Sequence, residues 1–237
     1  MGYRESVRSR RSAAGRLNTL ACGQPIDFAV ATFGPPALRR KHDAKLTESV
    51  FATPHALVQV LADDAIGILR WSITVIDERF VYRVRDLTFA QTDVRLGKSK
   101  FWNLTHDETG HVAVIDGGRL NYVEAHDFGA AGAHQTYLFT FNDAGVGEFD
   151  YVALREAGLL RLTDGVFATD SGELEPDAAA ALRSFRSATT INTLTVLGAS
   201  APPELLTLLP YGVDLDYVRV FRPSTARRRR ANHKGGV

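Results

Sequence analysis

Short runs of alternating apolar and polar residues recur through the middle of this chain, and this period-two pattern constrains the fold more than any other feature. Residues 70–75 and 80–85 show it most clearly, and Asp77 and Glu78 stand between them as turn residues. Alternation places apolar side chains on one face of a strand and polar side chains on the other. We therefore expect these two runs to form an antiparallel hairpin with one wet side.

Further strand-like runs follow at short intervals, separated by turn residues such as Gly117-Gly118 and those at 142–145. Residues 176–187 have a helical pattern, and Thr53-Pro54 begins either a second helix or a strand. The sequence predicts an all-β protein with one or two short helices, built as an antiparallel β-sandwich or jelly-roll-like single domain with extended basic termini. The other expected strands are 26–33, 94–96, 101–104, 111–115, 120–123, 136–141, 149–154, 159–162, 191–197 and 213–221.

Composition excludes several classes of protein. With 45% hydrophobic and 23% charged residues among 237, the chain has the composition of an ordinary globular protein. No stretch approaches the roughly 18 apolar residues of a membrane helix, and the N-terminus lacks the apolar core of a secretory signal. We expect no membrane association and no secretion through a signal peptide. The chain also shows no internal repeat of 20–50 residues.

Charge is strongly segregated along the chain, although the formal net charge is only +1. Residues 1–24 carry five arginines against one glutamate, and residues 222–237 carry six basic residues and no acid. Residues 25–221 are acidic, with 17 basic residues against 26 acids. We divide the chain accordingly into a basic N-terminal arm (1–24), a sandwich domain (25–221) and a basic C-terminal arm (222–237).

Clustered arginines attract polyanions by neutralising phosphates and releasing counterions. The two arms are therefore candidate nucleic-acid-binding segments, and the alternative is that they are solvated, solubilising tails. A second alternative applies to residues 1–22, which are rich in Arg, Ser and Ala and nearly free of acid, as organelle transit peptides are. The candidate nucleic-acid-binding residues are Arg4, Arg8, Arg10, Arg11, Arg16, Arg227, Arg228, Arg229, Arg230 and Lys234.

Catalytic and metal-binding motifs are weak. The densest set of potential metal ligands lacks the spacing of known metal sites, and we expect neither a metal nor another cofactor. Cys22 is the single cysteine, with no histidine near it in sequence, and the chain contains no nucleophile elbow or phosphate-binding glycine loop. We therefore expect no enzymatic activity. The potential ligands are His106, Asp107, His111, Glu124, His126, Asp127 and His134.

Two pairs of carboxylates, Glu148 with Asp150 and Asp214 with Asp216, have the i, i+2 spacing that would put both on one face of a strand. Such pairs bind calcium, act on glycosidic bonds, or simply face solvent. The segment VDLDYVRVFR, residues 213–222, resembles the closing strand of the laminarinase-like glycoside hydrolases and related concanavalin-type sandwiches. That family's catalytic pattern is E-x-D-x-x-E, but Ala153 follows Glu148 and Asp150 where the third acid would stand. The resemblance implies a sandwich fold and argues against that hydrolase activity.

Three functional hypotheses follow from these patterns. The first is a non-enzymatic structural protein of a large particle, such as a virion coat, capsid or phage subunit, with a body that contacts copies of itself or other subunits and arms that contact RNA, DNA or neighbouring subunits. The second is a glycan-binding or degenerate hydrolase-like sandwich. The third is an organellar accessory subunit with an N-terminal import signal. The first places the protein in a virion or another intracellular particle.

Overall fold

The computed structural model describes residues 3–105, 111–114, 121–129, 135–156, 176–201 and 212–213. Within these residues the protein is mainly β. The strands are β1 (Leu38–Lys41), β2 (Leu46–Ala52), β3 (Ala56–Asp63), β4 (Gly67–Val75), β5 (Tyr82–Arg83), β6 (Arg95–Leu96), β7 (His111–Val114), β8 (Asn121–Phe128), β9 (Gln135–Asn142) and β10 (Thr193–Leu197). The helices are α1 (Tyr3–Leu17), α2 (Ile26–Phe33), the 3-10 helix η1 (Phe101–Asn103), α3 (Tyr151–Glu156) and α4 (Pro176–Ala188).

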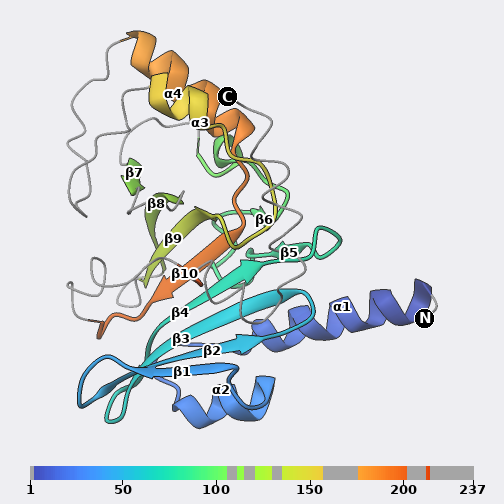
Figure 1. Ribbon diagram of the computed structural model, residues 1–237, viewed down its shortest axis with the longest axis vertical. Helices are drawn as coiled ribbons and strands as arrows, with labels where there is room; N and C mark the ends of the chain where they lie inside the picture. Colours follow the sequence, from blue (N-terminus) through green and yellow to red (C-terminus); the bar gives the residue numbers. More distant parts are fainter. Residues whose placement is uncertain are drawn as a thin grey trace.

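Eight of the described strands form one antiparallel sheet in the order β1-β2-β3-β4-β10-β9-β8-β7 (Figure 1). Strands β1–β4 and β7–β10 each pair in chain order, and β4 and β10 join the two four-stranded units at the centre. The strand order therefore has pseudo-twofold symmetry about the β4–β10 pair. Strands β5 and β6 pair separately as a short ribbon.

Hydroxyl hydrogen bonds at the centre of the sheet follow the same symmetry. Ile73 pairs with Leu194 in the β4–β10 register. On either side of this pair, Ser72 contacts Thr195 (Oγ to Oγ1, 2.8 Å), and Thr193 Oγ1 donates to Thr74 Oγ1 (2.9 Å). All four side chains are buried. Each of these buried hydroxyl groups thus has the hydrogen-bond partner that a buried polar group requires.

One face of the sheet carries the main hydrophobic core. Its central row runs across five strands through Phe51, Val58, Ile73, Leu194 and Phe139, which are successive cross-strand neighbours. The four α-helices contribute buried residues to the same cluster. Figure 1 shows α1 and α2 beside the β1–β4 end of the sheet and α3 and α4 at the β7–β8 end.

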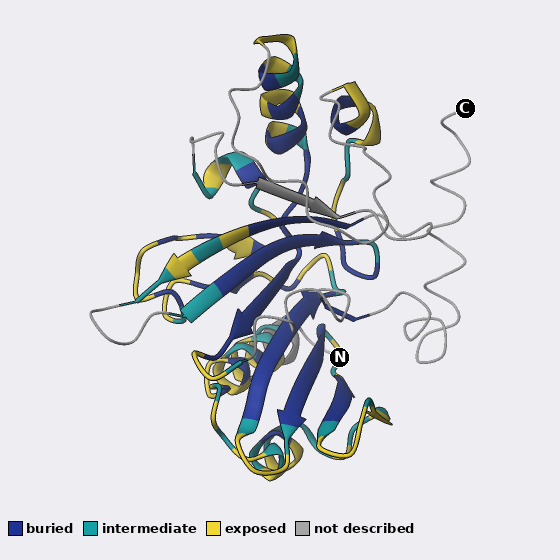
Figure 2. Ribbon diagram, turned by 90° about the vertical axis from the view of Figure 1, so that its left-hand side faces the viewer, coloured by how far each residue is buried: buried dark blue, intermediate teal, exposed yellow. Residues whose placement is uncertain are grey.

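The opposite face is buried but largely polar, with Gln59, Ser72 and Thr195 as neighbours across β3, β4 and β10. Figure 2 shows that the central strands are buried along most of their length. Smaller apolar clusters on this face include Ala201 and Val213. Eight of the ten described strands thus form one large sheet, and the second sheet of a sandwich stays a prediction.

The predicted extended N-terminal arm is a helix over most of its length. Helix α1 packs Ala13 and Leu17 into the core, and Leu20 follows it there. Asn18 Oδ1 accepts a hydrogen bond from the Tyr82 hydroxyl at 2.6 Å. The apolar residues are spaced by three or four, which places them on one side of a helix although arginines surround them.

The run Ile26–Phe33, predicted as a strand, is helix α2. Its β-branched residues favoured a strand, but the inward-facing positions Ile26, Ala29 and Phe33 have helical spacing. The helix ends at Gly34, whose φ of 87° is left-handed and whose N–H donates to the carbonyl of Val30 at 2.9 Å.

The helix considered after Thr53-Pro54 is instead strand β3, the second option for that segment. Thr53 belongs to the turn before β3, where its Oγ1 accepts the N–H of Ala56 (3.0 Å) and donates to the carbonyl of the same residue (2.7 Å). The expected hairpin between residues 70–75 and 80–85 is wrong. β4 pairs with β3 and β10, whereas β5 pairs with β6.

Of the remaining predicted elements, some are confirmed, some are wrong, and some lie outside the described residues. Within the described residues, the strands expected at 94–96, 111–115, 120–123, 136–141 and 191–197 are confirmed as β6, β7, β8, β9 and β10, and the helix expected at 176–187 is confirmed as α4. The strands predicted at 101–104 and 149–154 are wrong, because these residues form η1 and α3. Residues 159–162 and 214–221, and the Gly117-Gly118 turn, lie outside the described residues. The turn at 142–145 is present, with the Gly145 N–H donating to the Asn142 carbonyl at 2.9 Å.

Candidate nucleic-acid interface

Helix α1 presents arginines on the side away from the core. Arg8, Arg11 and Arg16 are exposed, whereas Ala13 and Leu17 are buried. The first two are three residues apart and lie on neighbouring positions of the helix surface. Arg4, in the same helix, precedes Arg8 by four residues. Docking of α1 thus fixes exposed positive charges on a rigid element.

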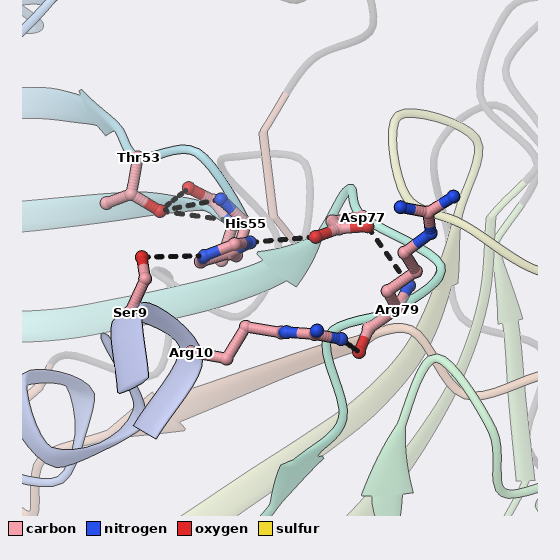
Figure 3. Close-up of polar contacts among 7 residues, drawn as sticks. Ser9, Arg10, Thr53, His55, Asp77 and Arg79 are labelled. Atoms are coloured by element: carbon pink, nitrogen blue, oxygen red, sulfur yellow. Dashed lines mark hydrogen bonds and ion pairs between the residues drawn. The ribbon is translucent and has the colours of Figure 1, made fainter. Parts of the chain in front are cut away.

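Arg10 has a different role from its neighbours. Its guanidinium Nη1 donates to the backbone carbonyl of Arg79 at 2.7 Å. Figure 3 shows the Arg10 side chain running from α1 to this carbonyl. Arg10 therefore links α1 to the segment after β4.

A second link joins α1 to the sheet through His55, in the turn between β2 and β3. Its Nδ1 lies 2.8 Å from Asp77 Oδ2, and its Nε2 lies 3.4 Å from Ser9 Oγ (Figure 3). The imidazole also stacks on Phe80, with ring centroids 5.2 Å apart. Helix α1, the turn between β2 and β3 and the segment after β4 thus meet at His55.

The Ser9–His55–Asp77 cluster has the group order of a hydrolase triad, but its geometry fits a structural role better. The hydroxyl-to-imidazole distance of 3.4 Å is long for a hydrogen bond. Ser9 also lies within a helix, where backbone N–H groups are bonded to carbonyls four residues earlier and are not free to stabilise an oxyanion. We therefore interpret the cluster as a device that positions α1.

The electrostatics of Asp77 support this interpretation. Partial burial acts to raise the pKa of its carboxyl, but the Arg79 N–H, the His55 imidazole and the charge of Arg10 outweigh burial and lower the pKa below its usual value. The Arg79 N–H donates to Asp77 Oδ1 at 3.0 Å. The ionised carboxylate is therefore stabilised where α1 docks.

The basic surface continues beyond α1 into residues 79–95, which contain four arginines and two aspartates. Arg79 adjoins Arg10, and Arg85 is exposed. Arg83 forms an exposed ion pair with Asp93 at 2.7 Å, and Arg95 lies 4.0 Å from the same carboxylate. Positive charge thus exceeds negative charge along this segment.

The remaining predicted arm residues, Arg227, Arg228, Arg229, Arg230 and Lys234, lie outside the described residues. Another basic run, Arg39-Arg40-Lys41, lies on β1 at the edge of the sheet, and its side chains are exposed. Charged side chains on an edge strand discourage pairing with a strand of another molecule. This run therefore has a sufficient explanation without a ligand.

Of the seven potential metal ligands, only Glu124, His126 and Asp127 have described side chains. Glu124 is fully buried and bound by Arg186, with Nε to Oε1 at 2.7 Å, and His126 Nε2 lies 3.7 Å from its other oxygen. Asp127 accepts a hydrogen bond from Thr136 at 2.6 Å. Within the described ranges, no three His, Cys, Asp or Glu residues gather as metal ligands would. His106, Asp107 and His134 fall outside those ranges, as does the side chain of His111.

The predicted pairing of Glu148 with Asp150 on one strand face is wrong, since these residues precede α3 and belong to no strand. Glu148 forms an exposed ion pair with Lys100 at 2.8 Å, which lowers the pKa of its carboxyl. Asp150 Oδ1 accepts the N–H of Ala153 at 3.0 Å, as a helix-capping residue does. Asp214 and Asp216 lie outside the described residues.

Cys22 is largely buried, and burial raises the pKa of its thiol to about 12. Its sulfur lies 3.6 Å from the carbonyl oxygen of Leu69. A thiol with a raised pKa is a poor nucleophile. The structure therefore indicates that Cys22 packs against the core and does not act as a nucleophile.

The sequence does not predict the cluster of Ser9, His55 and Asp77, because His55 is 46 residues from Ser9 and 22 from Asp77 and the three form no motif. From sequence, Asp77 is predicted only to be a turn residue. The one local signal is the run Thr53-Pro54-His55, which is compatible with a turn but does not indicate that His55 has a distant partner.

Comparisons with known proteins place the chain in no family. No family model matches it, and no curated protein is similar to it. Among solved structures, a cysteine-rich secretory protein of Staphylococcus aureus aligns over 81% of this chain with 11% identity and a TM-score of 0.30. The chain spans about half the length of that protein, 49%. So low a similarity supports no conclusion about fold or function.

No helix in the described part of the chain is both long and apolar enough to cross a membrane.

Proposed function

We propose that this protein is a non-enzymatic structural or assembly protein of a large particle, and that α1 and residues 79–95 form its nucleic-acid-binding surface. The observation that carries the proposal is the docking of α1, which buries Ala13 and Leu17 while leaving Arg8, Arg11 and Arg16 exposed. Because the helix already orders the backbone, only the side chains of these arginines lose conformational freedom when they neutralise phosphates.

The charge distribution supports a partner that is a polyanion. Basic residues are concentrated in the N-terminal helix, whereas residues 25–221 are acidic. An acidic body repels nucleic acid except where a basic surface faces it, so binding would be confined to that surface. The C-terminal basic residues, including Arg227 and Lys234, would add to it. The body would contact copies of itself or other subunits.

The packing of α1 favours a permanent element over a cleaved import signal. Ala13, Leu17 and Leu20 belong to the main core, and removing residues 1–22 would uncover the residues that they cover. Exposed apolar patches of this kind destabilise a protein or promote aggregation. A retained helix therefore accords with a binding role for its arginines.

We also propose that a second layer covers the polar face of the sheet, as in a β-sandwich. Val213 packs with Val50 and Leu57 on that face. A Cβ at Gly212 would lie 2.9 Å from Thr74 Oγ1, so the backbone comes very close to β4 there. The strand predicted at residues 213–221 would begin at this contact.

Titration of a fluorescently labelled dT20 oligonucleotide at several salt concentrations tests the binding surface. We expect Arg8→Glu with Arg11→Glu to weaken binding at least tenfold and to lower the slope of log K against log salt by about 1.4, since each phosphate contact to a single strand contributes about 0.7. The matched control is Arg155→Glu with Arg183→Glu, which makes the same charge change on exposed positions of α3 and α4. Equal losses in both pairs, or binding independent of salt, would refute the proposed surface.

A further inference from the structure

The loop between β5 and β6 holds an exposed aromatic ring in a strained backbone conformation. Phe89 is 52% exposed, and its φ is +52°. Ala90 follows with a φ of +61°. Two successive non-glycine residues in the left-handed region are uncommon, and such strain persists only where surrounding structure enforces it.

Backbone hydrogen bonds within the loop hold its conformation. The N–H groups of Leu87 and Thr88 donate to the Val84 carbonyl at 2.9 and 3.1 Å, and the Ala90 N–H donates to the Arg85 carbonyl at 2.9 Å. Thr88, beside the exposed ring, is fully buried, and its Oγ1 lies 3.2 Å from the Val84 carbonyl. The loop is therefore rigid, although its tip is exposed.

Two contacts tie the loop to the main sheet. The Tyr137 hydroxyl, from β9, donates to the Leu87 carbonyl at 2.7 Å. Gln91 Nε2 donates to the carbonyl of Gly129, just after β8, at 3.3 Å. The ring of Phe89 is thus presented by a loop fixed at its base and on one flank. Presenting an apolar ring in this way lowers the entropy lost on binding.

We propose that Phe89 stacks on an unpaired base, so that the nucleic acid bound by this protein is single-stranded. This inference rests on the proposed function, since the arginines of α1 and residues 79–95 would hold the phosphates. Arg83 and Arg85 precede the ring, and Arg95 follows it. Aromatic rings beside cationic side chains are the usual platform for single strands, whereas duplex bases are already stacked on one another.

Binding of dT20 and of a 20-base-pair duplex to the full chain tests this inference. We expect Phe89→Ala to weaken dT20 binding about tenfold and to leave duplex binding unchanged. The matched control is Val152→Ala on α3, which removes another exposed apolar side chain (53% exposed) and should change neither affinity. Thermal unfolding of Phe89→Ala should show only a small loss of stability, because about half of the residue is already exposed to solvent.

A second variant gives a direct signal of stacking. In Phe89→Trp, the added indole fluorescence should be quenched by dT20 and not by polyphosphate, after subtraction of the signal of the unmodified protein. Unchanged dT20 binding by Phe89→Ala, while the Arg8→Glu, Arg11→Glu pair loses it, would refute stacking and leave the proposed function standing. Failure of the unmodified chain to bind either oligonucleotide would refute both. If Phe89→Ala instead lost binding to vesicles of phosphatidylcholine and phosphatidylserine, with dT20 binding intact, the ring would be a membrane anchor and the inference wrong.

Discussion

At the scale of single residues, His55 and Asp77 form a polar cluster beside helix α1, which docks mainly through the buried Ala13 and Leu17. The ring of His55 lies between Asp77 and Ser9 and rests on Phe80. Because Asp77 has a lowered pKa in the folded protein, its ionised form contributes stability above the unfolded pKa of about 3.9, and this contribution is lost as the pH falls through the folded value.

Asp77→Asn should therefore destabilise the protein near neutral pH and have less effect in acid. We expect a cost of about 1 kcal/mol at pH 7, because the carboxylate is partly exposed. Urea unfolding at pH 7 and near pH 2 measures it. Asp64→Asn, in the exposed turn after β3, is the control and should have no comparable effect. A cost for Asp77→Asn that is equal at both pH values would contradict the role assigned to the carboxylate.

Gly34 and Gly212 form a second residue-scale test, because both have left-handed backbones with φ near +90°. A Cβ at Gly34 meets nothing within 4 Å, whereas one at Gly212 would lie 2.8 Å from Asn142 Nδ2. Gly34→Ala should cost about 1–3 kcal/mol from the backbone alone, because its φ of 87° and ψ of −169° lie in a region that only glycine readily adopts. Gly212→Ala should cost more, because a clash with Asn142 is added. Chemical denaturation compares them. Equal costs would mean that Gly212 does not pack on the polar face in solution.

At the scale of elements, α4 is joined to β8 by a buried ion pair. Arg186 binds both oxygens of Glu124, at 2.7 and 3.1 Å, and also donates to the Thr105 carbonyl at 2.9 Å. The Tyr122 hydroxyl donates to Glu124 at 2.9 Å. Burial, with the charge of Glu124, raises the pKa of Tyr122 well above its usual value.

Arg186→Leu should cost roughly 3–5 kcal/mol, because it leaves a buried carboxylate without its main counter-charge. Adding Glu124→Leu to Arg186→Leu should recover much of this loss, since it removes the unpaired charge. Arg183→Leu, an exposed change on the same helix, provides the control. The free energy of unfolding in urea distinguishes these cases, and a double variant no more stable than the single one would contradict the assignment.

Some of these elements can be predicted from the sequence, and others cannot. The strands of β7–β10 were predictable because short apolar runs stand between clear turn residues. The sequence does not predict helices α2 and α3, for local reasons. In Ile26–Phe33 the β-branched residues obscure the helical spacing, and Asp150, which caps α3, has the spacing of a carboxylate pair with Glu148. The β4–β10 pairing joins strands about 120 residues apart and has no local signal. The contacts of His55 were unpredictable for the same reason.

At the scale of the whole molecule, two four-stranded units meet at β4 and β10 and share one core face. The basic helix α1 belongs to the first unit, and α3 and α4 belong to the second (Figure 1). In our proposal, α1 would contact nucleic acid, and the end of the sheet beside α3 and α4 would contact other subunits. The charges of the chain follow the same division between a basic terminal element and an acidic body.

The native mass of the purified protein tests the central claim most directly. We would measure it by light scattering at low and high salt, and record absorbance at 260 and 280 nm across the same peak. The account predicts a particle many times larger than the 25.9 kDa chain, carrying nucleic acid that high salt releases. A monomer free of nucleic acid at both salt concentrations would contradict it.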